Sequence, residues 1–260
     1  MGMLDGKVAV VSGLGPGMGR DISLALAREG ADIVMAARQE KRMAKCAPEV
    51  EALGRRALQV VCDITSADDC AALADRVRAE LGQLDILVNN AFADGDHKLF
   101  VDSSIESWRS TMDVNFFGTL QLTRALLPLL TEQDDSRVIM INTMSMQRID
   151  PAMGAYAASK AALANATKTL AVELGRDGVR VNGVHPGYIW GRSVEWYFNQ
   201  MAEQRGITFQ EVYDEIAGTT CLGYLPSSEE IAGAVLFFAS PLSKPITGQY
   251  LSVNAGHFLA

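Results

Sequence analysis

A tyrosine and a lysine stand four residues apart in the segment YAASK, at Tyr156 and Lys160, with only small residues between them. In a helix this spacing puts both side chains on one face, where they can meet. A phenol has a pKa near ~10 and is a poor base at neutral pH, but a nearby ammonium group lowers that pKa. The pair could therefore transfer a proton to a carbonyl or from an alcohol. The alternative is a half-buried tyrosine beside a lysine that extends to solvent, and the spacing alone fits both.

A glycine-rich stretch, SGLGPGMGR, covers residues 12–20 and joins an apolar run to an amphipathic pattern. Glycines in such a turn let the backbone approach a phosphate, and the following helix presents free N–H groups to the anion. The residues that we expect to bind phosphate are Gly13, Gly15, Gly17, Met18 and Gly19. The alternative is a tight turn without a ligand, which the glycines alone do not rule out.

The position about twenty residues after the glycines holds no carboxylate. Dinucleotide-binding proteins that use NAD place an acidic residue there for the ribose hydroxyls, whereas this chain has Ala37 followed by Arg38. An arginine there can pair with the 2′-phosphate of NADP. The sequence therefore favours NADP(H), with NAD(H) as the alternative if Arg38 is only a solvated surface residue.

The elements that must position these residues alternate along the chain. Short apolar runs predict strands at 7–13, 32–37, 57–63, 84–91, 137–143, 179–187 and 248–256. Amphipathic patterns predict helices at 19–30, up to about 54, and at 66–82, 104–131, 155–175 and 227–240, with Ser66 and Ser227 or Ser228 as N-caps. Strands separated by helices predict an α/β fold, a Rossmann-type doubly wound parallel sheet of about seven strands with helices on both faces. Ligands bind such sheets beyond the carboxyl ends of the strands.

We expect one domain over residues 1–260, because the sequence shows no linker or internal repeat. The segment 188–226 reads as irregular and aromatic, and it contains Trp190, Trp196, Tyr197, Phe198 and Phe209. These aromatic side chains could close over an apolar or ring-shaped substrate, or pack the segment on the body or a subunit contact. The sequence leaves both interpretations open.

The composition narrows the classes of partner and compartment. The formal net charge is -8 over 260 residues, without a basic run, so nucleic acid and anionic membranes are not expected partners. No apolar stretch has membrane-spanning length, and the N-terminal residues lack a signal-peptide pattern. The four scattered cysteines fit a reducing cytoplasm. The three histidines, His97, His185 and His257, are not spaced with other residues in a metal-ligand pattern, so we expect no metal site.

Taken in order, the motifs of the chain resemble those of the short-chain dehydrogenase/reductase family over essentially the whole length. The matching pieces are SGLGPGMG, CDIT, NNA, Asn115 in MDVNFFG, Ser145 in INTMSMQ, YAASK, HPGYI and TGQYLSVNAG. The chain departs from the family pattern at Phe92, which stands where a glycine is common, and in a slightly short spacing between Ser145 and Tyr156.

The resemblance implies roles residue by residue. Tyr156 is the expected catalytic acid/base with Lys160 as its partner, and Ser145 orients and polarises the carbonyl, although Thr143 is an alternative. Asn115 is expected to hold a water that links Lys160 to solvent. The remaining cofactor contacts implied by the resemblance are Asp63, Ile64, Asn89, Ala91, Pro186, Gly187 and Ile189, with Tyr156 and Lys160 also against the cofactor.

These roles describe an NAD(P)-dependent oxidoreductase that transfers a hydride between the cofactor and a ketone or secondary alcohol, with a cyclic, aromatic or otherwise apolar substrate expected. One alternative is a 3-oxoacyl-[acyl-carrier-protein] reductase. An alternative of another class is a non-catalytic NAD(P)-binding sensor or scaffold. The resemblance also implies a homotetramer or homodimer that packs its long helices against symmetry mates.

Overall fold

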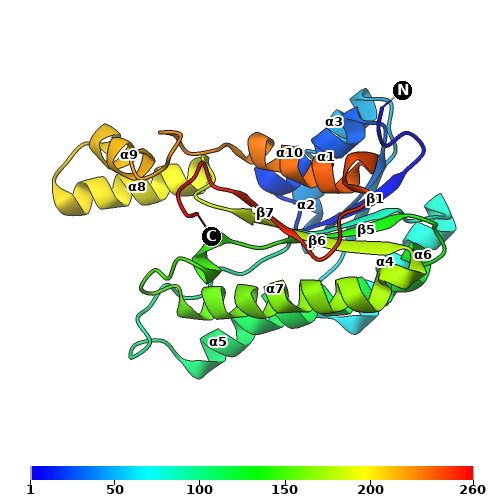
Figure 1. Ribbon diagram of the computed structural model, residues 1–260, viewed down its shortest axis with the longest axis horizontal. Helices are drawn as coiled ribbons and strands as arrows, with labels where there is room; N and C mark the ends of the chain where they lie inside the picture. The colour runs from blue at the N-terminus through cyan, green and yellow to red at the C-terminus, as the bar shows by residue number, and fades with distance from the viewer. Residues whose placement is uncertain (1, 260) are drawn as a thin grey trace.

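The computed structural model describes residues 2–259 and is built around a seven-stranded sheet (Figure 1). All neighbouring strands pair in parallel, in the order β3-β2-β1-β4-β5-β6-β7. The strands are β1 (Val8–Ser12), β2 (Asp32–Ala37), β3 (Ala57–Val61), β4 (Ile86–Asn89), β5 (Ser136–Ile141), β6 (Val179–Pro186) and β7 (Tyr250–Val253). The predicted doubly wound parallel sheet is therefore confirmed, and each strand lies within two or three residues of its expected limits.

Helices cover both faces of this sheet (Figure 1). One face carries α1 (Met18–Arg28), α2 (Glu40–Met43), α3 (Ala47–Ala52) and α10 (Ser228–Ala239), and α1 packs closely on α10. The other face carries α4 (Ala67–Leu81), α5 (Ile105–Met112), α6 (Thr119–Leu130) and α7 (Gly154–Leu174). Ser66 caps α4 through a side-chain hydrogen bond, as the sequence predicted, and of the two candidates for α10 it is Ser227 that forms the cap.

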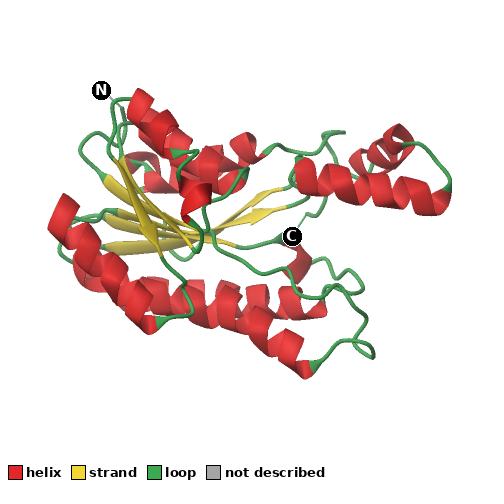
Figure 2. Cartoon of the chain, turned by 180° about the vertical axis from the view of Figure 1, so that it is seen from behind, coloured by secondary structure: helices red, strands yellow, loops and turns green. Residues whose placement is uncertain are grey.

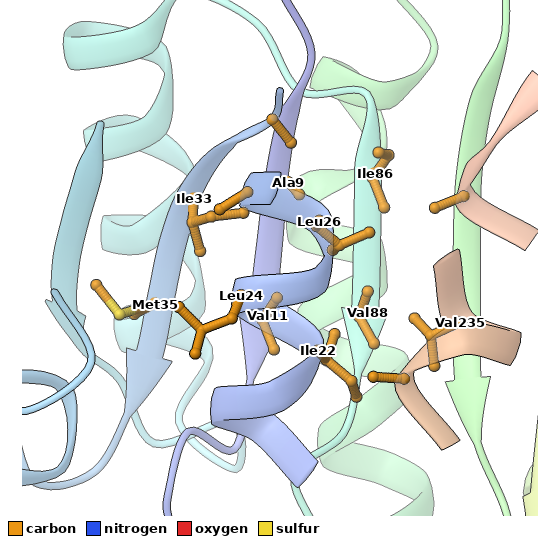
Figure 3. Packing of buried hydrophobic residues seen from close by; sticks show 14 of the residues in the cluster. Ala9, Val11, Ile22, Leu24, Leu26, Ile33, Met35, Ile86, Val88 and Val235 are labelled. Carbon is orange, nitrogen blue, oxygen red and sulfur yellow. The ribbon is translucent and has the colours of Figure 1, made fainter. Parts of the chain in front are cut away.

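The alternation of side chains along each central strand divides the core into two layers. Ala9 and Val11 of β1 join the cluster under α1 and α10, where Ile22 and Leu26 of α1 lie against them (Figure 3). Val8 and Val10, which alternate with them along β1, join the cluster under the helices of the opposite face. Successive side chains of a strand point to opposite faces, so apolar residues at every position are what a sheet covered on both sides requires.

The order of the strands places a crevice at the carboxyl end of the sheet. The chain runs outward from β1 to β2 and β3, and then crosses back so that β4 lies on the other side of β1. The loops that leave β1 and β4 therefore diverge, and the space between them is where a parallel sheet of this kind binds ligands. The glycine-rich turn follows β1, and the two asparagines are the last residue of β4 and the residue after it.

Two regions differ from their predicted structure. The single helix expected at 104–131 is α5 and α6 joined by a π-helical turn at Asp113–Gly118. The prediction that 188–226 is irregular was wrong, because this segment forms α8 (Arg192–Arg205) and α9 (Phe209–Ala217). Thr208 and Glu211 form a reciprocal capping box that starts α9, a signal that the sequence contained. Figure 2 shows this helical pair extending away from the sheet.

Within residues 2–259, no helix is both long enough and apolar enough to cross a membrane.

Candidate active site

Helix α7 carries both members of the tyrosine–lysine pair. Lys160 is almost fully buried, and its Nζ donates a hydrogen bond of 2.7 Å to the carbonyl oxygen of Ile141, the last residue of β5. Burial lowers the pKa of this lysine to about 7. Tyr156 lies one turn earlier on the helix, and burial raises the pKa of its phenol to about 12. The lowering of this pKa that we expected from the Lys160 ammonium is not seen, and desolvation sets the direction of the shift.

A second hydroxyl group lies beside Tyr156, and it belongs to Thr143. The nearby Thr143 hydroxyl lowers the pKa of the Tyr156 phenol and partly opposes the effect of burial. Thr143 caps a short 3₁₀ turn, Met144–Met146, by accepting a hydrogen bond of 3.2 Å from the backbone N–H of Ser145. Its hydroxyl donates to Ser145 Oγ, also at 3.2 Å. Both hydroxyls left open by the sequence are thus in one hydrogen-bonded chain, with Thr143 in contact with Tyr156.

Asn115 lies inside the π-helical turn and is fully buried. Its side chain clamps the main chain of Ala93, accepting from the N–H and donating to the carbonyl, both at 2.7 Å. The same amide donates to Ser159 Oγ at 2.9 Å, and Ser159 donates to the carbonyl oxygen of Tyr156. Asn115 therefore joins the loop after β4 to the helix that carries Tyr156.

The glycine-rich turn forms a cradle in which the backbone approaches its neighbours closely. Gly13 has a positive φ of 73°, and a Cβ there would lie 2.4 Å from the Cα of Ala91. A Cβ on Gly19 would meet the carbonyl oxygen of Gly13 at 2.8 Å. The side chain of Asn90 holds the turn from the other side by donating to the Ser12 and Gly13 carbonyls at 3.2 and 3.0 Å. This cradle, with α1 beginning just behind it, fits the pyrophosphate of a dinucleotide.

A cavity continues from the cradle along the ends of β2 and β3. Five residues predicted to bind the cofactor line it: Gly13, Arg38, Asp63, Ile64 and Ala91. The Asp63 carboxylate accepts two hydrogen bonds from Thr65, which hold its pKa below the usual range. The charge of Arg38 lowers that pKa further, so the guanidinium lies near Asp63.

The cavity also contains a second cation that the sequence analysis did not assign to it. Arg42 lines the same wall as Arg38, and its Nη1 would lie 3.4 Å from a Cβ on Gly15. Its Nε donates to Gln39 Oε1 at 3.4 Å and not to a carboxylate. The sequence signal that could have identified Arg42 is its spacing of four residues from Arg38. A helix that starts near Arg38 brings position i+4 back to the same side.

The other predicted cofactor residues also lie at the carboxyl edge of the sheet, with differing side-chain environments. The Asn89 amide donates to Thr123 Oγ1 at 2.9 Å, so its side chain turns toward α6. Pro186 ends β6, and the N–H of Gly187 donates to the Val253 carbonyl at 3.1 Å. Ile189 packs against the core cluster under α1 and α10. Gly17 caps α1, and Met18 is its first residue.

The aromatic residues of 188–226 pack mostly against one another. Phe198 is fully buried in a small cluster of α8 and α9, and Trp190 and Phe209 lie against it with ring centroids 6.3 and 6.4 Å away. Trp196 and Tyr197 are instead exposed on α8. Of the two interpretations left open, internal packing accounts for Trp190, Phe198 and Phe209.

His257 joins this helical pair to the loop after the 3₁₀ turn. Its Nε2 lies 2.8 Å from Arg148 Nη1 and 3.1 Å from Thr219 Oγ1, and its ring stacks on Tyr188. His97 is exposed and His185 is buried, as packing or surface residues would be. Among the described residues, no three His, Cys, Asp or Glu side chains are grouped as metal ligands.

Comparisons with known proteins place this geometry among oxidoreductases. A family model described as Enoyl-(Acyl carrier protein) reductase matches residues 13–257. The 7alpha-hydroxysteroid dehydrogenase of Escherichia coli (strain K12) is 31% identical over 97% of this chain and 94% of its own.

Solved structures agree in fold over nearly the full length. An NAD+-bound xylitol dehydrogenase superposes with a TM-score of 0.90 at 26% identity, covering 97% of this chain and 99% of its own. A variant of the actinorhodin polyketide ketoreductase with NADPH gives a TM-score of 0.90 at 27% identity, covering 99% of both chains. The similar structures thus include one with NAD+ and one with NADPH.

Proposed function

From the premise that the chain belongs to the short-chain dehydrogenase/reductase family, we propose roles for its individual residues. The protein is an oxidoreductase that transfers a hydride between a nicotinamide cofactor and a ketone or secondary alcohol. The observation that carries the assignment of roles is the place of the Thr143 hydroxyl, which is hydrogen-bonded to Ser145 and lies beside Tyr156, whose helix also carries the buried Lys160.

Tyr156 is the proposed acid/base. In the reductive direction, its phenol gives a proton to the carbonyl oxygen as the carbon accepts the hydride, so that the ketone becomes an alcohol and Tyr156 a phenolate. A phenol with a pKa of about 12 favours the protonated form needed for this step. The bound cofactor supplies the hydride and, when oxidised, a positive charge near Tyr156. That charge stabilises the phenolate, which the reverse reaction requires as a base.

Thr143 and Ser145 are the proposed donors to the substrate oxygen. Negative charge develops on that oxygen during hydride transfer, and a hydroxyl positioned beforehand stabilises it. Thr143 lies beside the phenol, whereas Ser145 accepts a hydrogen bond from Thr143 and so restricts its orientation. The single Thr143 hydroxyl proton is thus donated to Ser145, which keeps its own proton for the substrate oxygen. We therefore assign the principal contact to Ser145, the hydroxyl that the motif favoured, and a supporting contact to Thr143.

Lys160 and Asn115 are proposed to return the proton to Tyr156. A lysine with a pKa of about 7 exchanges protons readily near neutral pH. The Asn115 side chain is already committed to Ala93 and Ser159. The water expected at Asn115 would thus bind its main-chain carbonyl. The side chain instead holds the loop after β4 against the helix that carries Tyr156.

The proposed cofactor is NADP(H). The support is the pair of guanidinium groups, Arg38 and Arg42, in the wall of the cavity that continues from the glycine cradle. A 2′-phosphate carries charge that two arginines can bind with charge-assisted hydrogen bonds. Gly13, Gly15, Gly17, Met18 and Gly19 would hold the pyrophosphate. Asp63, Ile64 and Ala91 would contact the adenosine, with the Asn89 main chain nearby, and Pro186, Gly187 and Ile189 would lie by the nicotinamide.

The proposed substrate is a cyclic or otherwise apolar ketone. Relatives named for steroids and polyketides support a ring-shaped substrate. Trp196 and Tyr197 expose aromatic surface on α8, beside the carboxyl end of β6. Movement of α8 and α9 toward the site would bring this surface over the substrate and exclude water.

We also propose that the protein forms a homodimer or homotetramer in the cytoplasm. Phe117, in the π-helical turn, and Val172, on α7, are 57% and 82% exposed on the same helical layer. Exposed apolar side chains on neighbouring helices favour contact with another copy. Light scattering of purified protein tests the assembly, with a monomer as the contradicting result.

The test of the reaction is NADPH and NADH oxidation with a panel of cyclic, aromatic and acyl-thioester ketones. We expect turnover with a cyclic ketone and NADPH, and loss of turnover in Tyr156→Phe. Preference for an acyl carrier protein thioester would favour the second candidate, a 3-oxoacyl-[acyl-carrier-protein] reductase, to which the description of the matching family model points. Cofactor binding without turnover on any ketone would favour a non-catalytic sensor.

A further inference from the structure

Phe92 lies between the arginine-containing cavity and Tyr156. It follows Ala91 at the end of β4, and it lines the arginine-containing cavity together with Gly13 and Asp63. On its other side, its ring meets the Tyr156 ring in an edge-to-face contact, with centroids 6.5 Å apart and planes at 68°. A dinucleotide that runs from the cavity to Tyr156 must therefore pass along this ring.

The backbone at Phe92 is held on both sides. Ala91 N donates to Ser12 Oγ at 3.3 Å, which ties the residue before Phe92 to β1. The Asn115 side chain forms hydrogen bonds with the N–H and the carbonyl of Ala93. It also donates to Ser159, which in turn donates to the carbonyl of Tyr156. Five hydrogen bonds thus join the main chain on either side of Phe92 to β1 and to the helix that carries Tyr156.

The ring itself leaves much of its surface uncovered. Phe92 is 56% exposed, although its neighbours Ala91 and Ala93 are partly buried. Because Phe92 lines the cavity that the dinucleotide is proposed to occupy, a bound dinucleotide would cover the exposed part of its ring. Because a phenyl ring forms no strong hydrogen bonds, what it contributes to the adjacent phenol is the exclusion of water.

We propose that Phe92 is a positioning residue that shields the Tyr156 phenol from water during proton transfer, with its exposed face covered by the bound dinucleotide. This inference rests on the proposed acid/base role of Tyr156. It differs from a role in substrate contact, because water exclusion acts on the ionisation of Tyr156 whatever ketone is bound.

The test is the pH dependence of kcat/KM for alcohol oxidation with NADP⁺, in the wild type, Phe92→Gly and Phe92→Leu. Oxidation needs the phenolate, so the rate rises with pH through the pKa of Tyr156. Loss of the ring admits water, which favours the phenolate, so we expect the midpoint of the rise in Phe92→Gly to move down by about one pH unit. Leucine keeps apolar bulk, so Phe92→Leu should stay close to the wild-type midpoint.

Phe100→Ala is the matched control, because Phe100 is an exposed phenylalanine of the same loop whose ring contacts Trp108 and not Tyr156. We expect its midpoint to equal that of the wild type. Circular dichroism and NADPH titration of all variants show whether each is folded and binds cofactor, and weaker NADPH binding by Phe92→Gly alone would agree with the proposal.

An unchanged midpoint in Phe92→Gly would overturn the proposal. So would a change confined to the ratio of kcat/KM between bulky and small alcohols, since that result assigns Phe92 to the substrate. Tyr156→Phe, measured beside these variants, distinguishes a wrong role for Tyr156 from a wrong role for Phe92. If it keeps full turnover, the role of Tyr156 is wrong and the inference fails with it, whereas loss of turnover leaves the midpoints to decide on Phe92 alone.

Discussion

The Thr143 hydroxyl lies beside the Tyr156 phenol, whose pKa it lowers, and donates a hydrogen bond to Ser145 Oγ at 3.2 Å. The three side chains come from the end of β5, the 3₁₀ turn that follows it and the first turn of α7. This relationship orders the two hydroxyls, because the single proton of Thr143 is donated to Ser145, whose own proton stays available to a substrate.

Substitution of Ser145 is therefore expected to be more harmful than substitution of Thr143. Removal of a donor to a developing oxyanion costs about 10²–10³-fold in kcat, and we expect a loss of this size in Ser145→Ala. Ser145→Thr keeps the hydroxyl and should retain most activity. Thr143→Ala removes only the supporting contact, so a loss of about tenfold is expected. Steady-state kinetics with NADPH measure all three, and the reverse order would give the principal role to Thr143.

Cofactor affinity should depend on pH through Lys160. Its pKa of about 7 means that the ammonium form is present below pH 7 and is lost as the pH rises through that value. The ammonium attracts the negatively charged cofactor, so the dissociation constant of NADPH should rise by about tenfold between pH 7 and 9. Fluorescence titration measures this constant. Lys160→Met should abolish the dependence and Tyr156→Phe should preserve it, and a flat wild-type profile would contradict the assignment.

Cofactor choice should depend on Arg38 and Arg42 together. Each Arg→Ala change removes a charge-assisted contact to the 2′-phosphate, so kcat/KM for NADPH should fall by about 10–100-fold while that for NADH changes little. Lys41→Ala is the control, because Lys41 is an exposed cation of the same helix outside the cavity wall. Equal losses for both cofactors would mean that the arginines support the fold and not the choice of cofactor.

The folded protein should lose stability in mild acid through His185. Burial lowers the pKa of this histidine from its usual 6.5 to about 4. The unfolded chain therefore binds a proton below pH ~6.5 that the folded protein does not bind until about pH 4, and unfolding becomes easier across that window. The expected loss is about 3 kcal/mol.

Urea denaturation at several pH values tests this linkage. His185→Phe keeps a ring against Tyr250, whose ring centroid lies 4.2 Å from that of the histidine, but removes the titration. It should flatten the slope between pH 4 and 6.5, whereas His97→Asn, on the surface, should not. A variant slope as steep as that of the wild type would assign the acid sensitivity to other groups.

The glycine turn should tolerate a methyl group at one position and not at another. Gly13 combines a positive φ with a Cβ position 2.4 Å from backbone, so Gly13→Ala should lower the free energy of unfolding by about 2–4 kcal/mol and abolish cofactor binding. Gly15→Ala meets only the end of the Arg42 side chain at 3.4 Å. Its effect on stability should stay within about 1 kcal/mol, as thermal unfolding would show. Similar losses in both variants would contradict the close approach at Gly13.

The sequence alone determined the sheet, its order of elements and the edge on which the site lies. Short continuous apolar runs indicate strands covered on both faces, and their alternation with amphipathic helices indicates parallel connections. The spacing of Tyr156 and Lys160 likewise placed both on one face of α7. Capping signals at Ser66 and Ser227 located helix starts because these signals act within four residues.

Only the tertiary structure decided which side chains share the site across long separations. Thr143 and Ser145 are indistinguishable by type, and it is the turn at Met144–Met146 that puts one of them beside Tyr156. The pKa of Tyr156 moves upward because desolvation depends on everything packed around the phenol, not on the lysine four residues away. Phe92 gains its contact with Tyr156 across 64 residues of chain through the grip of Asn115 on Ala93, and no local pattern reports a contact that depends on how the whole chain packs.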